Sequence, residues 1–177
     1  MAAHPSTCSS RFRVFATRLG QVGIVAGPRG LQQVYLPQRS KASQRRAIRS
    51  EYPDAVDDRA LWPGLAAALR RYFGGERVEF DVRLDTTGAG DFEATVWQVC
   101  MRVPYGKTVS YQELARRAGH PGAARAAGSA MKHNRFPVVV PCHRVVKSDG
   151  SLGGYSGPLG VDFKRRLLEM EASGSRR

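Results

Sequence analysis

Short apolar stretches dominate residues 12–36, and two turn-forming stretches separate them. FRVFAT, VGIVA and LQQVYL are rich in the β-branched and aromatic residues that strands favour. The separators, Leu19-Gly20-Gln21 and Gly27-Pro28-Arg29-Gly30, carry the glycine and proline of tight turns. The pattern predicts three strands joined by tight turns.

The middle of the chain changes from a helical to an alternating pattern. Apolar residues recur at helical spacing after Asp57, and Gly74-Gly75 ends this pattern, which places Leu61, Leu65, Leu69, Tyr72 and Phe73 on one buried face. Residues 78–82 then alternate, which predicts a further strand. The polar, glycine-containing stretch 85–90 is the predicted linker between an N-terminal α/β domain, residues 11–90, and a C-terminal domain, residues 91–172.

Two helices and a glycine turn follow in the C-terminal half. A first helix is predicted with Asp91 as its N-cap and a buried face that includes Cys100. Ser110 with Glu113 three residues later forms a capping box that opens a helix to about Ala118. After the turn at 119–122, residues 123–133 form a second helix. Helix, short turn and helix make a helix-turn-helix.

The last third supplies the remaining elements. Three valines at 138–140 predict a buried strand that Pro141 ends. Residues 147–150 form a hairpin turn, 153–160 a flexible loop and 162–171 a final helix. The fold class is therefore α+β: a small N-terminal β-sheet plus helix domain, followed by a winged helix-turn-helix-like C-terminal domain. Residues 1–10 and 173–177 are expected to be disordered tails.

Composition narrows the function classes. The chain of 177 residues has no apolar run long enough for a membrane span, and its N-terminus lacks the apolar core of a signal peptide. Three cysteines without close spacing argue for a reducing compartment. We expect a cytoplasmic protein, or a nuclear one if the source is eukaryotic, and a monomer without a membrane partner.

Charge points to a polyanionic partner. The net charge is +13, and residues 102–147 carry nine Lys or Arg against the single acid Glu113. Clustered cations of this kind favour nucleic acid. A second basic stretch, residues 39–49, holds five cations and no acid. For that stretch a solvated surface is the preferred interpretation over a DNA contact.

Cys142 and His143 are the first candidates for chemistry. A thiol at the end of a buried strand is either a core cysteine, as most single cysteines are, or a nucleophile. Neighbours along an extended chain point to opposite sides, so His143 needs a water or a turn to reach the sulfur.

Arg125 is the only long polar side chain in the helical stretch AARAAGSAM. Side chains this small read little in the major groove, but they allow close approach to the narrow minor groove. A lone arginine there could fill the gap left by an extruded base. Tight packing against another helix is the alternative.

The run PCHRV resembles the active-site motif of the O6-alkylguanine-DNA alkyltransferases, the methylated-DNA–protein-cysteine methyltransferase family. GKTVSYQELA, GAARAAGSAM, an asparagine at 134 and GGYSG at 153–157 match in order and spacing. The resemblance is specific from about residue 92 to residue 171. It implies a DNA repair protein that flips O6-alkylguanine out of duplex DNA and transfers the alkyl group irreversibly to its own cysteine.

The resemblance also implies roles for single residues. Cys142 is the alkyl acceptor, His143 the base acting through a water, and Glu171 the residue that orients the imidazole; two extra residues before the last helix leave Glu169 as an alternative. DNA is contacted by Arg125 as the arginine finger, by Tyr111 beside the target phosphate, by Asn134, and by the small residues Ala123, Ala124, Ala127 and Gly128. The substrate pocket comprises Tyr111, Val145, Tyr155, Ser156 and Lys164.

No metal or organic cofactor is expected. A zinc site needs four Cys or His ligands, and the first ninety residues offer only His4 and Cys8. No phosphate-binding glycine motif appears. Three alternatives remain: an alkyltransferase-like lesion binder, which would lack the thiol; a winged-helix regulator, which would need base-reading side chains; and a cysteine hydrolase, which would leave the basic helix-turn-helix unexplained.

Overall fold

The computed structural model describes residues 10–155 and 160–174. The N-terminal half is built on a four-stranded sheet of order β3-β2-β1-β4. β1 (Arg11–Thr17), β2 (Gly20–Gly27) and β3 (Gly30–Gln38) form an antiparallel meander, as the sequence predicts, and the short β4 (Val56–Asp57) pairs parallel to β1. The predicted tails at 1–9 and 175–177, and Ser156, lie outside the described residues.

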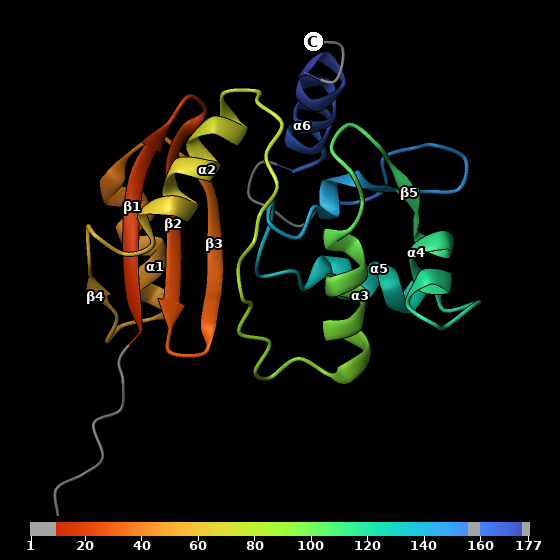
Figure 1. The fold of residues 1–177 in the computed structure, drawn as a ribbon, viewed down its shortest axis with the longest axis horizontal. Coiled ribbons are helices and arrows are strands. Elements are labelled where there is room, and N and C mark those ends of the chain that lie inside the picture. Colours follow the sequence, from red (N-terminus) through yellow and green to blue (C-terminus); the bar gives the residue numbers. More distant parts are fainter. Residues whose placement is uncertain (1–9, 156–159, 175–177) are drawn as a thin grey trace, which may run out of the picture.

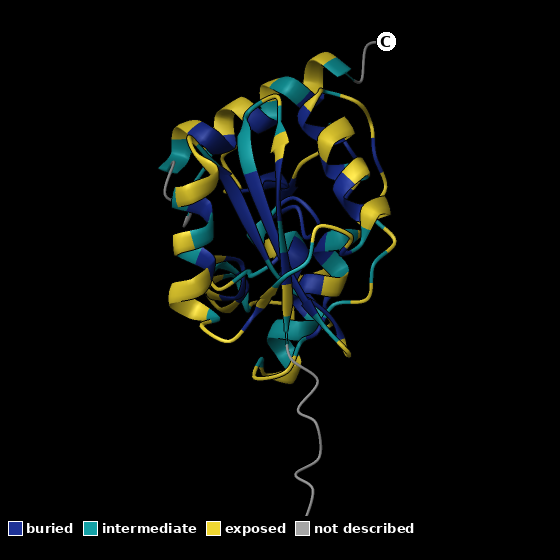
Figure 2. Ribbon diagram, turned by 90° about the vertical axis from the view of Figure 1, so that its left-hand side faces the viewer, coloured by how far each residue is buried: buried dark blue, intermediate teal, exposed yellow. Residues whose placement is uncertain are grey.

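Both faces of this sheet are covered by helices (Figure 1). Alternate side chains of a strand point to opposite faces, so Phe12 and Val14 pack with Ile48 of α1 (Lys41–Glu51), while Phe15 belongs to the cluster that contains α2 (Pro63–Phe73). The basic stretch 39–49 covers most of α1, and the helix carries exposed residues on its outer side (Figure 2).

The C-terminal half is largely helical. α3 (Asp91–Met101) is followed by β5 (Val109–Ser110), α4 (Tyr111–Arg117) and α5 (Ala124–Lys132). The Ser110 side chain accepts a hydrogen bond from the Glu113 N–H and caps α4, as predicted. The chain then forms the 3₁₀ helix η1 (Cys142–Arg144), β6 (Val145–Val146), which pairs parallel to β5, and α6 (Gly160–Gly174).

Two predicted strands are absent from the described residues. Residues 78–82 form no strand, because the edge of β3 is bonded elsewhere: Leu31 exchanges hydrogen bonds with Arg83 and Asp85, and Val34 donates to the carbonyl of Arg135. The valines at 138–140 are buried as predicted, but they form a tight turn. The wing of the helix-turn-helix stays a prediction, since the pair β5 and β6 is parallel rather than a hairpin.

Helix boundaries need smaller corrections. Gly90, not Asp91, is the N-cap of α3, and α2 begins at Pro63, later than the pattern after Asp57 suggested. α6 runs on through residues 172–174, so part of the predicted tail is helical.

One hydrophobic cluster runs through both halves. It contains Leu69 and Tyr72 of α2 together with Trp97 of α3, Leu114 of α4 and Leu167 of α6. Cys100 is fully buried in the same cluster, as expected. The two halves are therefore held in a fixed relation, and residues of α2 can reach the neighbourhood of η1. Among the described helices, none is long and apolar enough to cross a membrane.

Candidate active site

The turn before Cys142 is strained and braced. Val138 has φ = 75°, a left-handed conformation that a β-branched residue rarely adopts. The Val140 N–H donates to the Phe136 carbonyl at 2.7 Å, which closes the turn. Asn134 holds both ends, since its amide donates to the Val140 carbonyl and its oxygen accepts from the Phe136 N–H, each at 2.9 Å. Strain held by surrounding structure is typical of functional sites.

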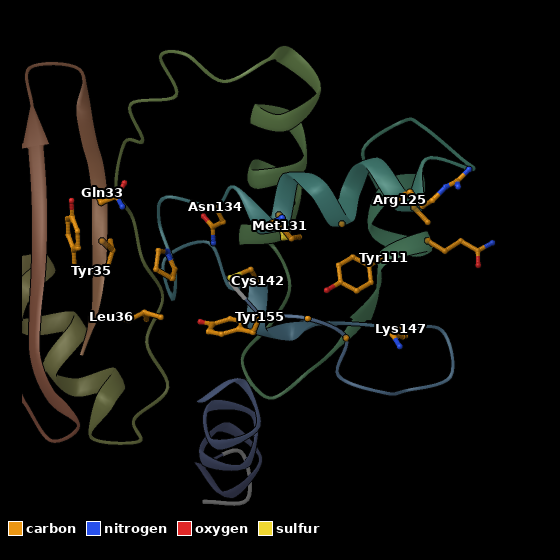
Figure 3. A pocket seen from close by; sticks show the side chains of 18 of the residues that line it. Gln33, Tyr35, Leu36, Tyr111, Arg125, Met131, Asn134, Cys142, Lys147 and Tyr155 are labelled. Carbon is orange, nitrogen blue, oxygen red and sulfur yellow. The ribbon is translucent and has the colours of Figure 1, made fainter. Parts of the chain in front are cut away.

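This turn places Cys142 at the first position of η1, facing a cavity (Figure 3). The residue is 8% exposed. Burial raises the pKa of its thiol, while the Asn134 amide, the Lys164 ammonium and the Tyr155 hydroxyl act in the opposite direction. The thiolate is therefore disfavoured at rest, but donors and a cation already surround the position where its charge would develop.

His143 points away from the cavity into a buried polar cluster. Its Nε2 lies 2.8 Å from Glu171 Oε1 and 3.0 Å from the Tyr72 hydroxyl. The same hydroxyl donates to Glu171 Oε1 at 2.7 Å. The other ring nitrogen, Nδ1, is buried without a hydrogen-bond partner among the described residues.

Glu171 is the carboxylate of this cluster, and Glu169 is exposed on the outer side of α6. Arg144 donates from Nε to Glu171 Oε2 and from Nη2 to Oε1, both at 2.9 Å. Although burial pushes the pKa of Glu171 up, hydrogen bonds from His143 and Arg144 hold it at about 2. Arg144 is thus the counter-ion, and burial lowers the pKa of His143, which favours a neutral imidazole at pH 7.

The cavity beside Cys142 has a volume of about 1160 Å³ and lies between β3 and the pair α4 and α5. α5 lines it with residues spaced one helical turn apart: Ala124, Gly128 and Met131. Figure 3 shows Tyr111 on the cavity side and Arg125 extending outward at the far end of α5. Gly153 lies beside the Tyr111 ring and has φ = 66°, a left-handed conformation that favours glycine.

Several predicted contact residues are placed differently. Ala127 is fully buried, so the prediction that it contacts DNA is wrong; it packs against the core. Val145 and Lys164 are fully buried beneath the cavity and do not line it, with the Lys164 Nζ donating to the Val145 carbonyl at 2.5 Å. Burial lowers the pKa of Lys164 to about 8. Ala123 and Ala124 remain half-buried, and Asn134 and Tyr155 line the cavity.

Two residues of the polar cluster were missed by sequence reasoning. Arg144 lies inside the PCHRV run, where a position next to His143 was the available signal. Tyr72 was counted only as part of the apolar face of its helix, because its hydroxyl meets a residue 99 positions away. Its contact shows that the N-terminal half, which offered no readable chemistry, reaches the site.

In the part of the chain that the structure describes, no group of three His, Cys, Asp or Glu side chains is arranged to hold a metal ion.

Comparisons with known proteins agree on one family. The family model for the DNA-binding domain of 6-O-methylguanine DNA methyltransferase matches residues 91–173. Curated methylated-DNA–protein-cysteine methyltransferases include one from Mycobacterium bovis, 41% identical over 89% of this chain and 86% of that protein, and one from Methanosarcina acetivorans, 34% identical over 92% and 98%. A crystal structure of Mycobacterium tuberculosis OGT in complex with DNA matches with a TM-score of 0.75 and 36% identity, over 93% of this chain and 94% of that one. The chain therefore belongs to the methylated-DNA–protein-cysteine methyltransferase family.

Proposed function

We propose that this protein repairs O6-alkylguanine in double-stranded DNA by transferring the alkyl group to its own Cys142, once and irreversibly. The observation that carries the proposal is the placement of the Cys142 thiol at a cavity, directly followed by a histidine held by a buried carboxylate. Family membership supports the same chemistry.

The transfer is a displacement at the alkyl carbon. The Cys142 sulfur forms a bond to that carbon, the carbon–O6 bond breaks, and its electron pair passes to the guanine, which takes up a proton. The thiol must give up its own proton first. His143 is the base: its Nε2 is held by Glu171, so Nδ1 is the nitrogen that takes the proton, through a bridging water.

The surroundings of Cys142 support this role. The Asn134 amide, the Tyr155 hydroxyl and the Lys164 ammonium lower the cost of the thiolate once the proton has left. The thioether product has no path back, because a carbon–sulfur bond is not hydrolysed by the groups of this site. A cysteine hydrolase would have to regenerate its free thiol after each reaction, and the thioether formed here is not converted back to a thiol.

Access to the thiol requires the damaged base to leave the helix stack. Cys142 is only 8% exposed at the cavity, out of reach of a base stacked in a duplex. We propose that α5 lies in the minor groove through its small residues Ala123, Ala124 and Gly128, that Arg125 fills the gap in the stack, and that Tyr111 crowds the adjacent phosphate. Tyr155 forms a wall for the flipped base, and Ser156, which the resemblance assigns to the same pocket, lies outside the described residues.

The protein is proposed to act as a monomer in the cytoplasm, or in the nucleus if the source is eukaryotic, with no cofactor, because the reaction needs only the thiol, the base and the DNA.

A duplex with one O6-methylguanine tests the function. Incubation with increasing protein should yield unmodified guanine in proportion to the protein added, and Cys142→Ser should yield none. Product beyond one equivalent would refute the single-use mechanism.

A further inference from the structure

Tyr72 brings the N-terminal half into contact with the catalytic histidine. It lies on α2, outside residues 91–173, which the family model covers. The side chain is fully buried, and its hydroxyl touches both members of the pair: 2.7 Å to Glu171 Oε1 and 3.0 Å to His143 Nε2. A buried tyrosine of the core would be satisfied by a single backbone carbonyl, as Tyr105 is by Gly75.

We propose that Tyr72 is a positioning residue for alkyl transfer: its hydroxyl fixes the proton of His143 on Nε2 and weakens the pull of Glu171 on that proton. This inference rests on the proposed function, since it concerns the same thiol and the same base.

The tautomer follows from counting protons among three atoms. Glu171 is ionised and only accepts, so the single proton of the Tyr72 hydroxyl goes to Oε1. The lone pairs of the phenol oxygen then face His143 Nε2. Both neighbours of Nε2 are acceptors, so Nε2 carries the hydrogen, and Nδ1 is left free to take the proton of the thiol.

The strength of the base follows from the charges around the ring. Glu171 of α6 favours the imidazolium, whereas burial and the cations Arg144 and Lys164 disfavour it. Tyr105 and Tyr155 also lie near this cluster, and burial raises the pKa of both hydroxyls, so neither carries a charge at pH 7. By donating to Oε1, Tyr72 takes up part of the charge of the oxygen that faces Nε2, and so keeps His143 neutral to lower pH.

The test compares the rate of alkyl transfer from free O6-benzylguanine over a range of pH in the wild type and in Tyr72→Phe. Without the hydroxyl, Glu171 holds the imidazolium more strongly, and the pH below which the rate falls should move upward by about half to one unit. Incorporation of 3-fluorotyrosine at position 72 keeps the ring and supplies a stronger hydrogen-bond donor. The pH below which the rate falls should then move downward.

Tyr105→Phe is the matched control, because it removes a hydroxyl beside the same cluster that donates to a backbone carbonyl instead. This substitution should leave unchanged the pH below which the transfer rate falls. If Tyr72→Phe lowers the rate equally at every pH, or only lowers the melting temperature, and the fluorinated protein matches the wild type, Tyr72 is a packing residue and the inference is wrong. No transfer by the wild type at any pH would instead refute the proposed function.

Discussion

At the scale of single residues, the charge balance around Glu171 governs both stability and chemistry. Its carboxylate accepts hydrogen bonds from Arg144, His143, Tyr72 and the Gly106 N–H, and it is fully buried. Arg144 has a second partner, the Val103 carbonyl at 2.6 Å, but Glu171 is its counter-ion. Removing this one negative charge leaves a guanidinium in the core without a counter-charge.

Glu171→Gln should therefore destabilise the protein by about 3–5 kcal/mol, the usual cost of breaking a buried ion pair from one side. Urea unfolding measures the change. Glu169→Gln is the control on the same helix, and as an exposed substitution it should stay within about 0.5 kcal/mol of the wild type. Equal effects of the two substitutions would mean that the buried pair contributes no more than a surface charge.

At the scale of elements, α5 presents small residues over its first two turns, where Arg125 is the one long side chain; Met131 and Lys132 lie at its C-terminal end. Arg125 is exposed, and no ion pair or hydrogen bond of its side chain is seen among the described residues. Its removal should leave the fold intact. Arg125→Ala should slow repair of duplex DNA by about 10- to 100-fold, since unstacking a base costs a few kcal/mol.

The comparison that isolates Arg125 uses two substrates. Transfer from free O6-benzylguanine needs no flipping and should be nearly unchanged in Arg125→Ala. Arg165→Ala on α6, where the arginine pairs with Asp162, serves as the control for loss of one surface charge. An equal loss on duplex and free base would assign Arg125 to the fold.

How far the sequence predicts these elements depends on how local their determinants are. α4 was predicted from Ser110 and Glu113, which make their contact within one turn of helix. The valine run was misassigned, because Asn134 takes the backbone groups of Phe136 and Val140 that a strand would need. The role of Tyr72 could not be predicted, because it exists only where α2 meets α6.

At the scale of the whole molecule, the structure reduces the number of cations available to DNA. Of the nine in residues 102–147, Arg144 is buried against Glu171, Arg135 donates to the Asp85 and Thr87 carbonyls, and Arg116 and Arg117 share Glu113. Among the described residues, the exposed cations of this stretch that form no ion pair are Arg102, Lys107, Arg125, Lys132 and Lys147.

DNA affinity should fall steeply with salt and depend little on sequence. Each phosphate contact adds about 0.9 to the slope of log affinity against log salt concentration. Fluorescence anisotropy at several salt concentrations, with two unrelated duplexes, measures that slope. An affinity that does not change with salt concentration would mean that phosphate contacts do not drive DNA binding.

Alkylation should make the protein less stable. Cys142 is only 8% exposed at the wall of the cavity, beside Tyr155 and Asn134, so a methyl group on its sulfur must share the space that these side chains occupy, and crowding of this kind typically costs about 1–3 kcal/mol. The methylated protein should melt about 2–10 °C below the unmodified one in the same buffer. Because Asn134 directly follows α5 and its C-cap, the strain should also weaken DNA binding. An unchanged melting temperature would mean that the site has room for the methyl group.

The central claim is that Cys142 is the acceptor and is used once. Intact-mass analysis after incubation with an excess of O6-methylguanine duplex tests it most directly. We predict one added methyl group per protein molecule, located by peptide mapping on the peptide that contains Cys142. Methylation of Cys8 or Cys100 instead, or guanine restored in the duplex well beyond one equivalent while the protein mass stays unchanged, would contradict this mechanism.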